Sequence, residues 1–411
     1  MKLNKFVKQV STLAGGTALA QLLGVATLPI ITRLYTPAEL GVFALFVSVT
    51  TILGLFSSFN YEEAIMAADT NEKAGKIVWL LALLISCTAI PLSVLVYYSV
   101  GFLNFGSTSL FFLVLSSIVA ISVSTFYRSL YYFNNRGQHY KSLTKGRIYG
   151  AFVLALTTIV YGYFYQGVEG LILGSILGQV TNVFYLLVYG QWSFARYTRP
   201  DLSMLRELIK TEIRFPLYLL PSGLLSRVSS QLHFLIINQY FNPALVGAIS
   251  LHNKVIGMPI SVLGTSIGDV FKARARLLLK EQGNAKDLFV KTVVTLFAIS
   301  FPISAIMFFY SPVLFVFVFG EQWALAGKVS QILAINFLLA FVVSPVSALI
   351  YLEKNQKYDF YIQSFLILML SVGMTYSVFN NDAWLAIYTY SFSYAVKYIF
   401  ELIICFKIAK S

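Results

Sequence analysis

The sequence predicts an all-α polytopic membrane protein with twelve transmembrane helices, arranged as two six-helix lobes related by a pseudo-twofold axis along the membrane normal. Three observations support this prediction: a large apolar content, an internal repeat and the placement of positive charge. Of the 411 residues, 58% are hydrophobic and 11% are charged, whereas soluble domains carry about 25% charged residues. A soluble core could not bury this many apolar side chains, so we expect the chain to lie in a bilayer.

Apolar runs of spanning length recur along the whole chain. A helix needs roughly 20 apolar residues to cross the hydrocarbon core. Twelve such runs lie at about 10–31, 39–59, 77–98, 109–133, 148–166, 170–190, 213–240, 244–270, 292–311, 326–351, 360–379 and 384–406. The first begins like a signal peptide but continues through Ile31, beyond a normal signal-peptide core, so we expect it to be retained.

An internal repeat relates the two halves of the chain. The segment LPIITRLYTPAELGVFALF from Leu28 aligns without a gap with FLIINQYFNPALVGAISLH from Phe234, at an offset of 206 positions. Internal repeats of this kind are typical of membrane transporters, and six spans per half make the two copies parallel. We therefore expect lobes at 1–195 and 196–411, joined through the polar connection at about 191–212.

Positive charge is concentrated on alternate connections between the predicted spans. The net charge is +13. One set of alternate connections carries nearly all the Lys and Arg residues, and Arg33 is the only one on the other set. Cytoplasmic loops of membrane proteins carry such an excess of Lys and Arg, so the pattern predicts that both termini are cytoplasmic. It also argues against a nucleic-acid-binding surface. The two cysteines, Cys87 and Cys405, fall inside predicted spans and are interpreted as packing residues.

Polar residues inside the predicted spans are the first candidate site residues, because a charge at mid-span costs roughly 2.5–3.5 kcal/mol on insertion scales. Arg227 lies near the middle of the seventh run, and Gln231 shares its helical face. The repeat places Gln21 of the first run opposite Arg227. Lys254 lies near the middle of the eighth run. The nearby His252 is a further candidate for substrate binding, although a purely structural role fits this residue equally well.

Charged residues near the span ends complete the candidate set. Arg33 and Arg128 are further candidates for substrate binding, and Glu62 is the candidate for ion coupling. A transporter of two lobes is expected to have a cavity between them, and Arg227 and Lys254 would make that cavity cationic. A guanidinium pairs well with phosphate oxygens. The pattern therefore favours an anionic substrate head such as a phosphate or pyrophosphate. A purely structural tie between helices is the alternative for Arg227. We expect no catalytic residue, cofactor or metal, since no phosphate loop and no paired Cys or His spacing occurs.

Several segments resemble the Wzx-type lipid-linked oligosaccharide flippases of the multidrug/oligosaccharidyl-lipid/polysaccharide exporter superfamily. They are TLAGGTALAQLLGVATLPIITRLYTPAELGVFALF, FNYEEAI, NNRGQHYKSLTKGRI, RFPLYLLPSGLLSRVSSQ and VGAISLHNKVIGMPISVLGTSIGDVF. In FNYEEAI, Asn60 stands where that family frequently has Arg, and Glu62 matches its glutamate; Lys254 stands where an Arg is common.

The resemblance implies transport by alternating access, with no enzymatic activity. The substrate would be an undecaprenyl-diphosphate-linked oligosaccharide, moved across the bacterial cytoplasmic (inner) membrane for surface polysaccharide such as O-antigen lipopolysaccharide or capsule. Implied partners are the polyprenyl-diphosphate-linked glycan, membrane lipids, H⁺ or Na⁺, and a glycan polymerase. An ion-coupled small-molecule or drug antiporter of the same superfamily is the main alternative. A flippase for the peptidoglycan lipid precursor and a glycan polymerase rank below it, because the first usually has additional helices and the second a large external loop.

The charge pattern makes a topology prediction. Reporter fusions that are active only in the cytoplasm are expected to be active at both the N-terminus and the C-terminus. Fusions after Asn242 or Asn380, in short connections predicted to be external, should be inactive. Activity at only one terminus would require an odd number of spans and would contradict the predicted twelve.

Overall fold

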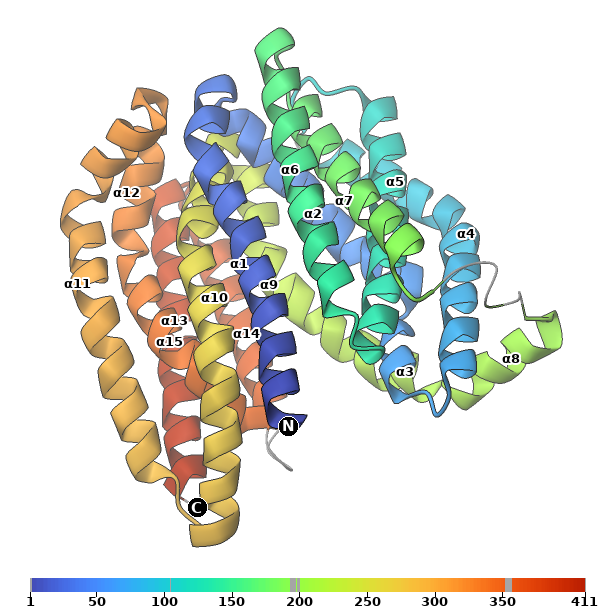
Figure 1. Cartoon of the computed structure of the whole chain (residues 1–411). Coiled ribbons are helices and arrows are strands. Elements are labelled where there is room, and N and C mark those ends of the chain that lie inside the picture. The colour runs from blue at the N-terminus through green and yellow to red at the C-terminus, as the bar shows by residue number, and fades with distance from the viewer. Residues whose placement is uncertain (1, 104, 193–196, 198–199, 352–356, 411) are drawn as a thin grey trace. The chain divides into compact units, whose positions relative to one another are not determined.

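The structure is a computed structural model that describes residues 2–103, 105–192, 197, 200–351 and 357–410. It is helical, with no β-strand among these residues (Figure 1). Contacts divide the chain into two compact units, Met1–Tyr35 with Val42–Arg227 and Thr36–Gly41 with Val228–Ser411. The lobe boundary between residues 195 and 196 stays a prediction.

The first unit contains seven helices of the N-terminal half and the segment that follows them. These are α1 (Lys2–Leu34), α2 (Pro37–Ser58, whose first residues through Gly41 belong to the second unit), α3 (Glu62–Ala67), α4 (Asn71–Phe102), α5 (Leu110–Arg136), α6 (Tyr140–Phe164), α7 (Glu169–Tyr189), α8 (Leu202–Thr211), the π-helical turn η1 (Phe215–Leu219) and the start of α9 (Leu220–Tyr240). Helix α6 packs against both α1 and α7, and α5 packs against α4 and α7 (Figure 1).

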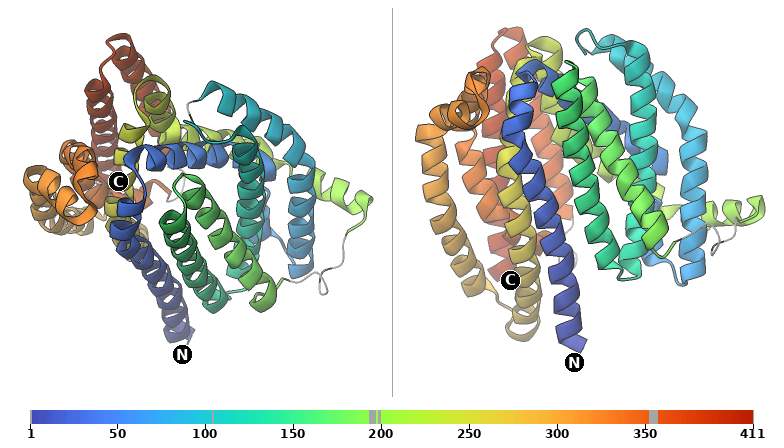
Figure 2. Two further views of the ribbon diagram at one scale, coloured as in Figure 1. Left: turned by 90° about the horizontal axis from the view of Figure 1, so that it is seen from above. Right: turned by 45° about the horizontal axis from the view of Figure 1, so that its top comes forward.

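The second unit contains the remaining helices. These are α10 (Pro243–Gln282), α11 (Lys286–Phe319), the 3₁₀ turn η2 (Glu321–Trp323), α12 (Ala324–Ile332), α13 (Ala334–Val346), the 3₁₀ turn η3 (Ser347–Tyr351), α14 (Lys357–Phe379) and α15 (Ala383–Lys410). Helix α13 packs against α10, α11 and α15, while α14 packs against α15, as the two views of Figure 2 allow the reader to follow.

Eight helices of the described residues are long and apolar enough to cross a membrane. The bent pair Glu321–Ile332 and Ala334–Ile350, with a 55° angle between its parts, brings the number to nine if it forms one span. The chain is therefore a multi-pass membrane protein, but the count of twelve stays a prediction. The runs predicted at 213–240 and 384–406 do form helices, α9 and α15. Polar side chains, including Arg227 and the Lys397–Glu401 pair, lower their hydropathy.

Close helix packing in the first unit depends on small residues. A Cβ added at Gly150 of α6 would lie 2.7 Å from the carbonyl oxygen of Gly178 in α7, and one added at Gly178 would lie 2.8 Å from that of Gly150. Helices in membranes pack closely through such residues because lipid offers no hydrophobic driving force for their association.

The repeat seen in the sequence appears as a reciprocal backbone contact within the second unit. A Cβ at Gly41 would lie 1.8 Å from the carbonyl oxygen of Pro243, and a Cβ at Gly247 would lie 1.9 Å from that of Pro37. In each copy of the Pro-x-x-x-Gly segment, the glycine thus packs against the carbonyl oxygen of the proline in the other copy. Only glycine fits at either position, because the obstructing atom is backbone rather than a movable side chain.

We predict that Gly41→Ala and Gly247→Ala destabilise the protein by similar amounts, about 1–3 kcal/mol each, as is typical of overpacking. Gly101→Ala in α4 is the matched control, because a Cβ there meets nothing within 4 Å. Thermal unfolding of the purified protein in detergent measures the effect. A destabilised Gly41→Ala beside an unaffected Gly247→Ala would contradict the reciprocal contact.

Candidate functional site

Three of the charged residues singled out in the sequence lie together in the first unit. Nη1 of Arg128 on α5 is 3.2 Å from Oε1 of Glu62 on α3. Arg227 on α9 interacts electrostatically with both of these residues. The side chain of Glu62 is only 4% exposed and that of Arg128 is 22% exposed. We call Glu62, Arg128 and Arg227 the charge cluster; it holds two guanidinium groups against one buried carboxylate.

Helix α2 positions both guanidinium groups through its backbone. Nη1 of Arg227 donates a hydrogen bond to the carbonyl oxygen of Thr51 at 3.0 Å. Nη2 of Arg128 donates to the carbonyl oxygen of Gly54 at 3.2 Å. Thr51 and Gly54 are three residues apart and so lie on the same face of the helix. Each carbonyl has a second lone pair that can accept such a bond, so α2 holds the two arginines one turn apart.

The sharp connection between α2 and α3 positions Glu62. Phe59 and Asn60 both adopt left-handed backbone conformations, with φ of 50° and 60°, which costs an L-residue roughly 1–2 kcal/mol. Nδ2 of Asn60 donates to the carbonyl oxygen of Leu219 at 2.8 Å and so fixes the connection to η1. The Wzx-type flippases that the sequence resembles often have Arg at this position. In this chain the amide of Asn60 instead joins the α2–α3 connection to the backbone of η1.

A second carboxylate lies beside the charge cluster but has a different partner. The hydroxyl of Tyr132 donates a hydrogen bond to Oε1 of Glu63 at 2.6 Å. Tyr132 lies one helical turn after Arg128 on α5, so the two residues reach the neighbouring acids Glu62 and Glu63 from one helix face. Sequence reasoning missed Tyr132. Its spacing of four from Arg128 was the available signal.

The other predicted site residues of the first unit lie on α1. Gln21 is half-buried in the middle of this helix, and Arg33 is exposed near its C-terminal end. Thr17, one turn before Gln21, accepts a hydrogen bond from Nη1 of Arg147 on α6. Helix α1 is therefore joined to α6 next to Gln21 by Arg147, a cation that the sequence analysis did not single out.

The second unit contains the remaining predicted site residues. Gln231 on α9 donates to the hydroxyl of Ser230 at 3.3 Å. His252 on α10 is 4% exposed, and its Nδ1 lies 2.9 Å from the hydroxyl of Ser330 on α12. Lys254, two residues later, is half-buried. Lys397 and Glu401 on α15 form an ion pair, with Nζ 3.0 Å from Oε1.

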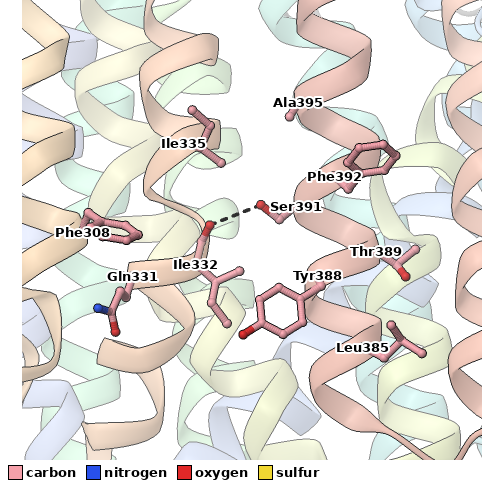
Figure 3. Close-up of a pocket in the computed structure, with 10 residues that line it drawn as sticks. All are labelled: Phe308, Gln331, Ile332, Ile335, Leu385, Tyr388, Thr389, Ser391, Phe392 and Ala395. Atoms are coloured by element: carbon pink, nitrogen blue, oxygen red, sulfur yellow. Dashed lines mark hydrogen bonds between the residues drawn. The ribbon is translucent and has the colours of Figure 1, made fainter.

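An apolar groove of about 860 Å³ lies along the second unit where α12 and α13 meet at a bend. Figure 3 shows side chains of α11, α12, α13 and α15 around it. Phe392 is 64% exposed and Tyr388 55% exposed. The bend frees the carbonyl oxygen of Ile332 from the regular helix, and the hydroxyl of Ser391 donates to it at 3.2 Å. The groove is thus mainly apolar, with its exposed backbone group satisfied.

Solved structures with the same fold are membrane transporters. The lipid II flippase MurJ in an inward closed conformation has a TM-score of 0.71 at 12% identity, covering 97% of this chain and 89% of that chain. An inward-facing multidrug resistance MATE family transporter of the MOP superfamily has a TM-score of 0.61 at 14% identity, covering 95% of each chain. A MOP superfamily transporter from Pyrococcus furiosus has a TM-score of 0.56 at 16% identity, covering 98% of this chain and 95% of that one. At these identities the similarity shows the fold alone.

A search of curated proteins found no match. The family described as "Polysaccharide biosynthesis protein" matches residues 30–328, which include all but the first two residues of the repeat, the charge cluster and His252 and Lys254. The chain is therefore a multi-pass membrane protein of the polysaccharide biosynthesis protein family with the fold of MOP superfamily transporters.

Proposed function

We propose that the protein is a flippase that moves an undecaprenyl-diphosphate-linked oligosaccharide across the cytoplasmic membrane for surface polysaccharide biosynthesis. The observation that supports this most directly is the charge cluster, in which Arg128 and Arg227 lie on one face of α2. In a chain of the polysaccharide biosynthesis family, the anion such a pair would bind is the diphosphate that carries the glycan.

The two arginines provide a matched binding site for a diphosphate. Each guanidinium is a planar fork with five N–H donors and stays charged at any physiological pH. Within a low-dielectric bundle, charge-assisted hydrogen bonds of this kind are about twice as strong as neutral ones. Under the predicted orientation, the C-terminal ends of α2 and α5 face the cytoplasm. The charge cluster would then receive the diphosphate from the inner leaflet.

Glu62 provides a means of coupling transport to protons. Its Oε1 pairs with Arg128, while its Oε2 is buried and has no hydrogen-bond partner among the described residues. A diphosphate that takes Arg128 would leave this carboxylate buried and unpaired. An unpaired buried carboxylate is costly and is relieved by taking up a proton. Substrate binding and protonation of Glu62 would therefore favour each other.

The apolar groove of the second unit suits the polyprenyl tail. Its lining is largely aromatic and aliphatic (Figure 3), and the backbone carbonyl of Ile332 beside it already accepts a hydrogen bond from Ser391. An isoprenoid chain needs apolar contact and offers no hydrogen bonds, so it would lose nothing by lying there. The tail would remain against the protein while the head group crosses.

We predict that Arg128→Ala and Arg227→Ala each reduce glycan export at least tenfold, because each removes a charge-assisted interaction of about 1.5–3 kcal/mol. Lys254→Ala is expected to reduce export as well, through loss of the second-unit cation. Surface glycan is measured at matched protein levels, together with accumulation of the lipid-linked precursor. Exposed Arg206→Ala on α8 is the matched control and should export normally. Normal export by all three test variants would show that the cations are structural.

Glu62→Gln should retain binding of the lipid-linked glycan but lose the response of transport to a proton gradient, because the amide keeps the shape of the side chain and cannot titrate. Transport into proteoliposomes with and without a pH gradient measures this. Glu63→Gln is the matched control, since the neighbouring carboxylate bonds to Tyr132 rather than to an arginine. A Glu62→Gln variant that still responds like the wild type would rule out this carboxylate as the coupling group.

A further inference from the structure

A separate cavity of about 260 Å³ lies within the second unit, between α10, the α12–α13 bend and α15. None of the residues that form the charge cluster contributes to it. It is lined by His252, Asn253, Ile256, Gly257, Ile260, Leu333, Asn336, Phe337, Ala340, Tyr390, Tyr394 and Tyr398. At roughly 30 Å³ per water molecule in the liquid, this volume holds about nine waters. It is large enough for one sugar ring.

The lining of this cavity is uncharged and combines polar with apolar side chains. Two amides, one imidazole and three phenols face it, and no carboxylate, lysine or arginine is among its lining residues. A metal or sodium ion is disfavoured, because such ions need carboxylates to offset their desolvation in a low-dielectric site. A hydrocarbon tail is disfavoured as well, because it would leave the acceptor of Asn336 without a hydrogen bond. The chemistry fits a neutral ligand that carries many hydroxyl groups.

One wall of the cavity consists of three tyrosines of α15, which we call the tyrosine ladder. Tyr390, Tyr394 and Tyr398 follow one another at intervals of four on α15, and the first two rings lie 4.9 Å apart, edge to face. The ring of His233 stacks on Tyr390 at 4.2 Å with an interplanar angle of 24°. The amide of Asn253 lies near the hydroxyl of the same tyrosine. Tyrosine gives a large, stiff face and a polar tip at low entropic cost, which suits the mixed apolar and polar surface of a sugar.

The opposite walls offer an unused acceptor and open space. Oδ1 of Asn336 is buried and has no hydrogen-bond partner among the described residues. Asn336 is a lining residue of the cavity, and because buried polar atoms are nearly always bonded, its orphan acceptor indicates a missing partner. A Cβ built on Gly257 meets nothing within 4 Å, so the glycine leaves room on that side. Gly257, Tyr394 and Tyr398 are each only partly buried, and the cavity is therefore open there.

We propose that this cavity is a sugar-binding subsite that holds one ring of the transported glycan, with the ring against the tyrosine ladder and a hydroxyl donating to Asn336. The proposal rests on the proposed function, because it takes the glycan as the cargo. It adds a second point of recognition that reads the sugar rather than the diphosphate. A site that bonds to a hydroxyl discriminates strongly against a ligand that lacks it, so this subsite would contribute glycan specificity.

The test compares two lipids on the purified full-length protein in lipid nanodiscs. One is the polyprenyl-diphosphate-linked glycan extracted from cells that lack the transporter, and the other is undecaprenyl diphosphate without sugar. Gly257→Leu fills the cavity, and Asn336→Leu removes the orphan acceptor while keeping similar size. Gly101→Leu is the matched control, since that glycine also has nothing within 4 Å of a Cβ and lies in α4 of the first unit. Native mass spectrometry measures binding, and thermal unfolding checks folding.

Both cavity variants are expected to bind the glycan-linked lipid about tenfold or more weakly and to bind undecaprenyl diphosphate as the wild type does. Asn336→Leu should also unfold at no lower temperature, because the lost acceptor has no protein partner. Unchanged glycan-lipid binding in both variants would mean that the cavity holds water only and would overturn the subsite. Equal affinity of the wild type for the two lipids would overturn it too, while leaving the diphosphate site intact. If the wild type binds neither lipid, the proposed function itself fails.

Discussion

Ionised side chains within an apolar helical bundle must be paired and hydrogen-bonded, and this requirement governs the arrangement of the first unit. Glu62 is 3% exposed and would be very costly as a lone carboxylate. Its partner Arg128 arrives from α5, and the carbonyl oxygens of α2 hold that guanidinium and the one of Arg227. The left-handed backbone at Phe59 and Asn60 is tolerated because it directs Glu62 toward this pair. The ion pair and the hydrogen bonds to α2 therefore offset the cost of the strained backbone and of the buried charge.

The positions of the two arginines change the interpretation of the internal repeat. In the sequence, Arg227 belongs to the second copy, and its counterpart in the first copy is Gln21. In the structure, Arg227 bonds to the carbonyl of Thr51 and is the last residue of the first unit. The repeat does predict equivalent positions for Gly41 and Gly247, and these glycines make reciprocal contacts. It cannot predict that α9 contributes its first part to one unit and its second part to the other.

The helical class, the membrane location and the identity of the charged residues could all be predicted from the sequence. Apolar runs and mid-span charges are local signals, because the bilayer penalises each residue separately. The pairing of Glu62 with Arg128 could not be predicted, since it joins residues far apart in the chain and depends on helix packing. The hydrogen bond from Tyr132 to Glu63 and the contact of Asn60 with Leu219 depend on the same packing. His252 illustrates the remaining ambiguity of sequence, because its bond to Ser330 and its place in the cavity wall make it structural and site-lining at once.

The charge cluster, the cavity beside the tyrosine ladder and the apolar groove differ in the kind of chemical group that each can bind. The charge cluster has two guanidinium groups and one carboxylate, the cavity beside the tyrosine ladder combines neutral polar groups with apolar side chains, and the groove along α15 is mainly apolar. A lipid-linked glycan has the same three parts: a diphosphate, hydroxylated rings and a hydrocarbon chain. A binding site uniform in character could favour only one of them, because desolvating the others would cost more than their contacts return. Under the proposed function, separate sites within the two units would allow each part to be desolvated against groups of its own kind. A carrier with such sites could move a strongly polar head group through a bilayer without releasing the tail.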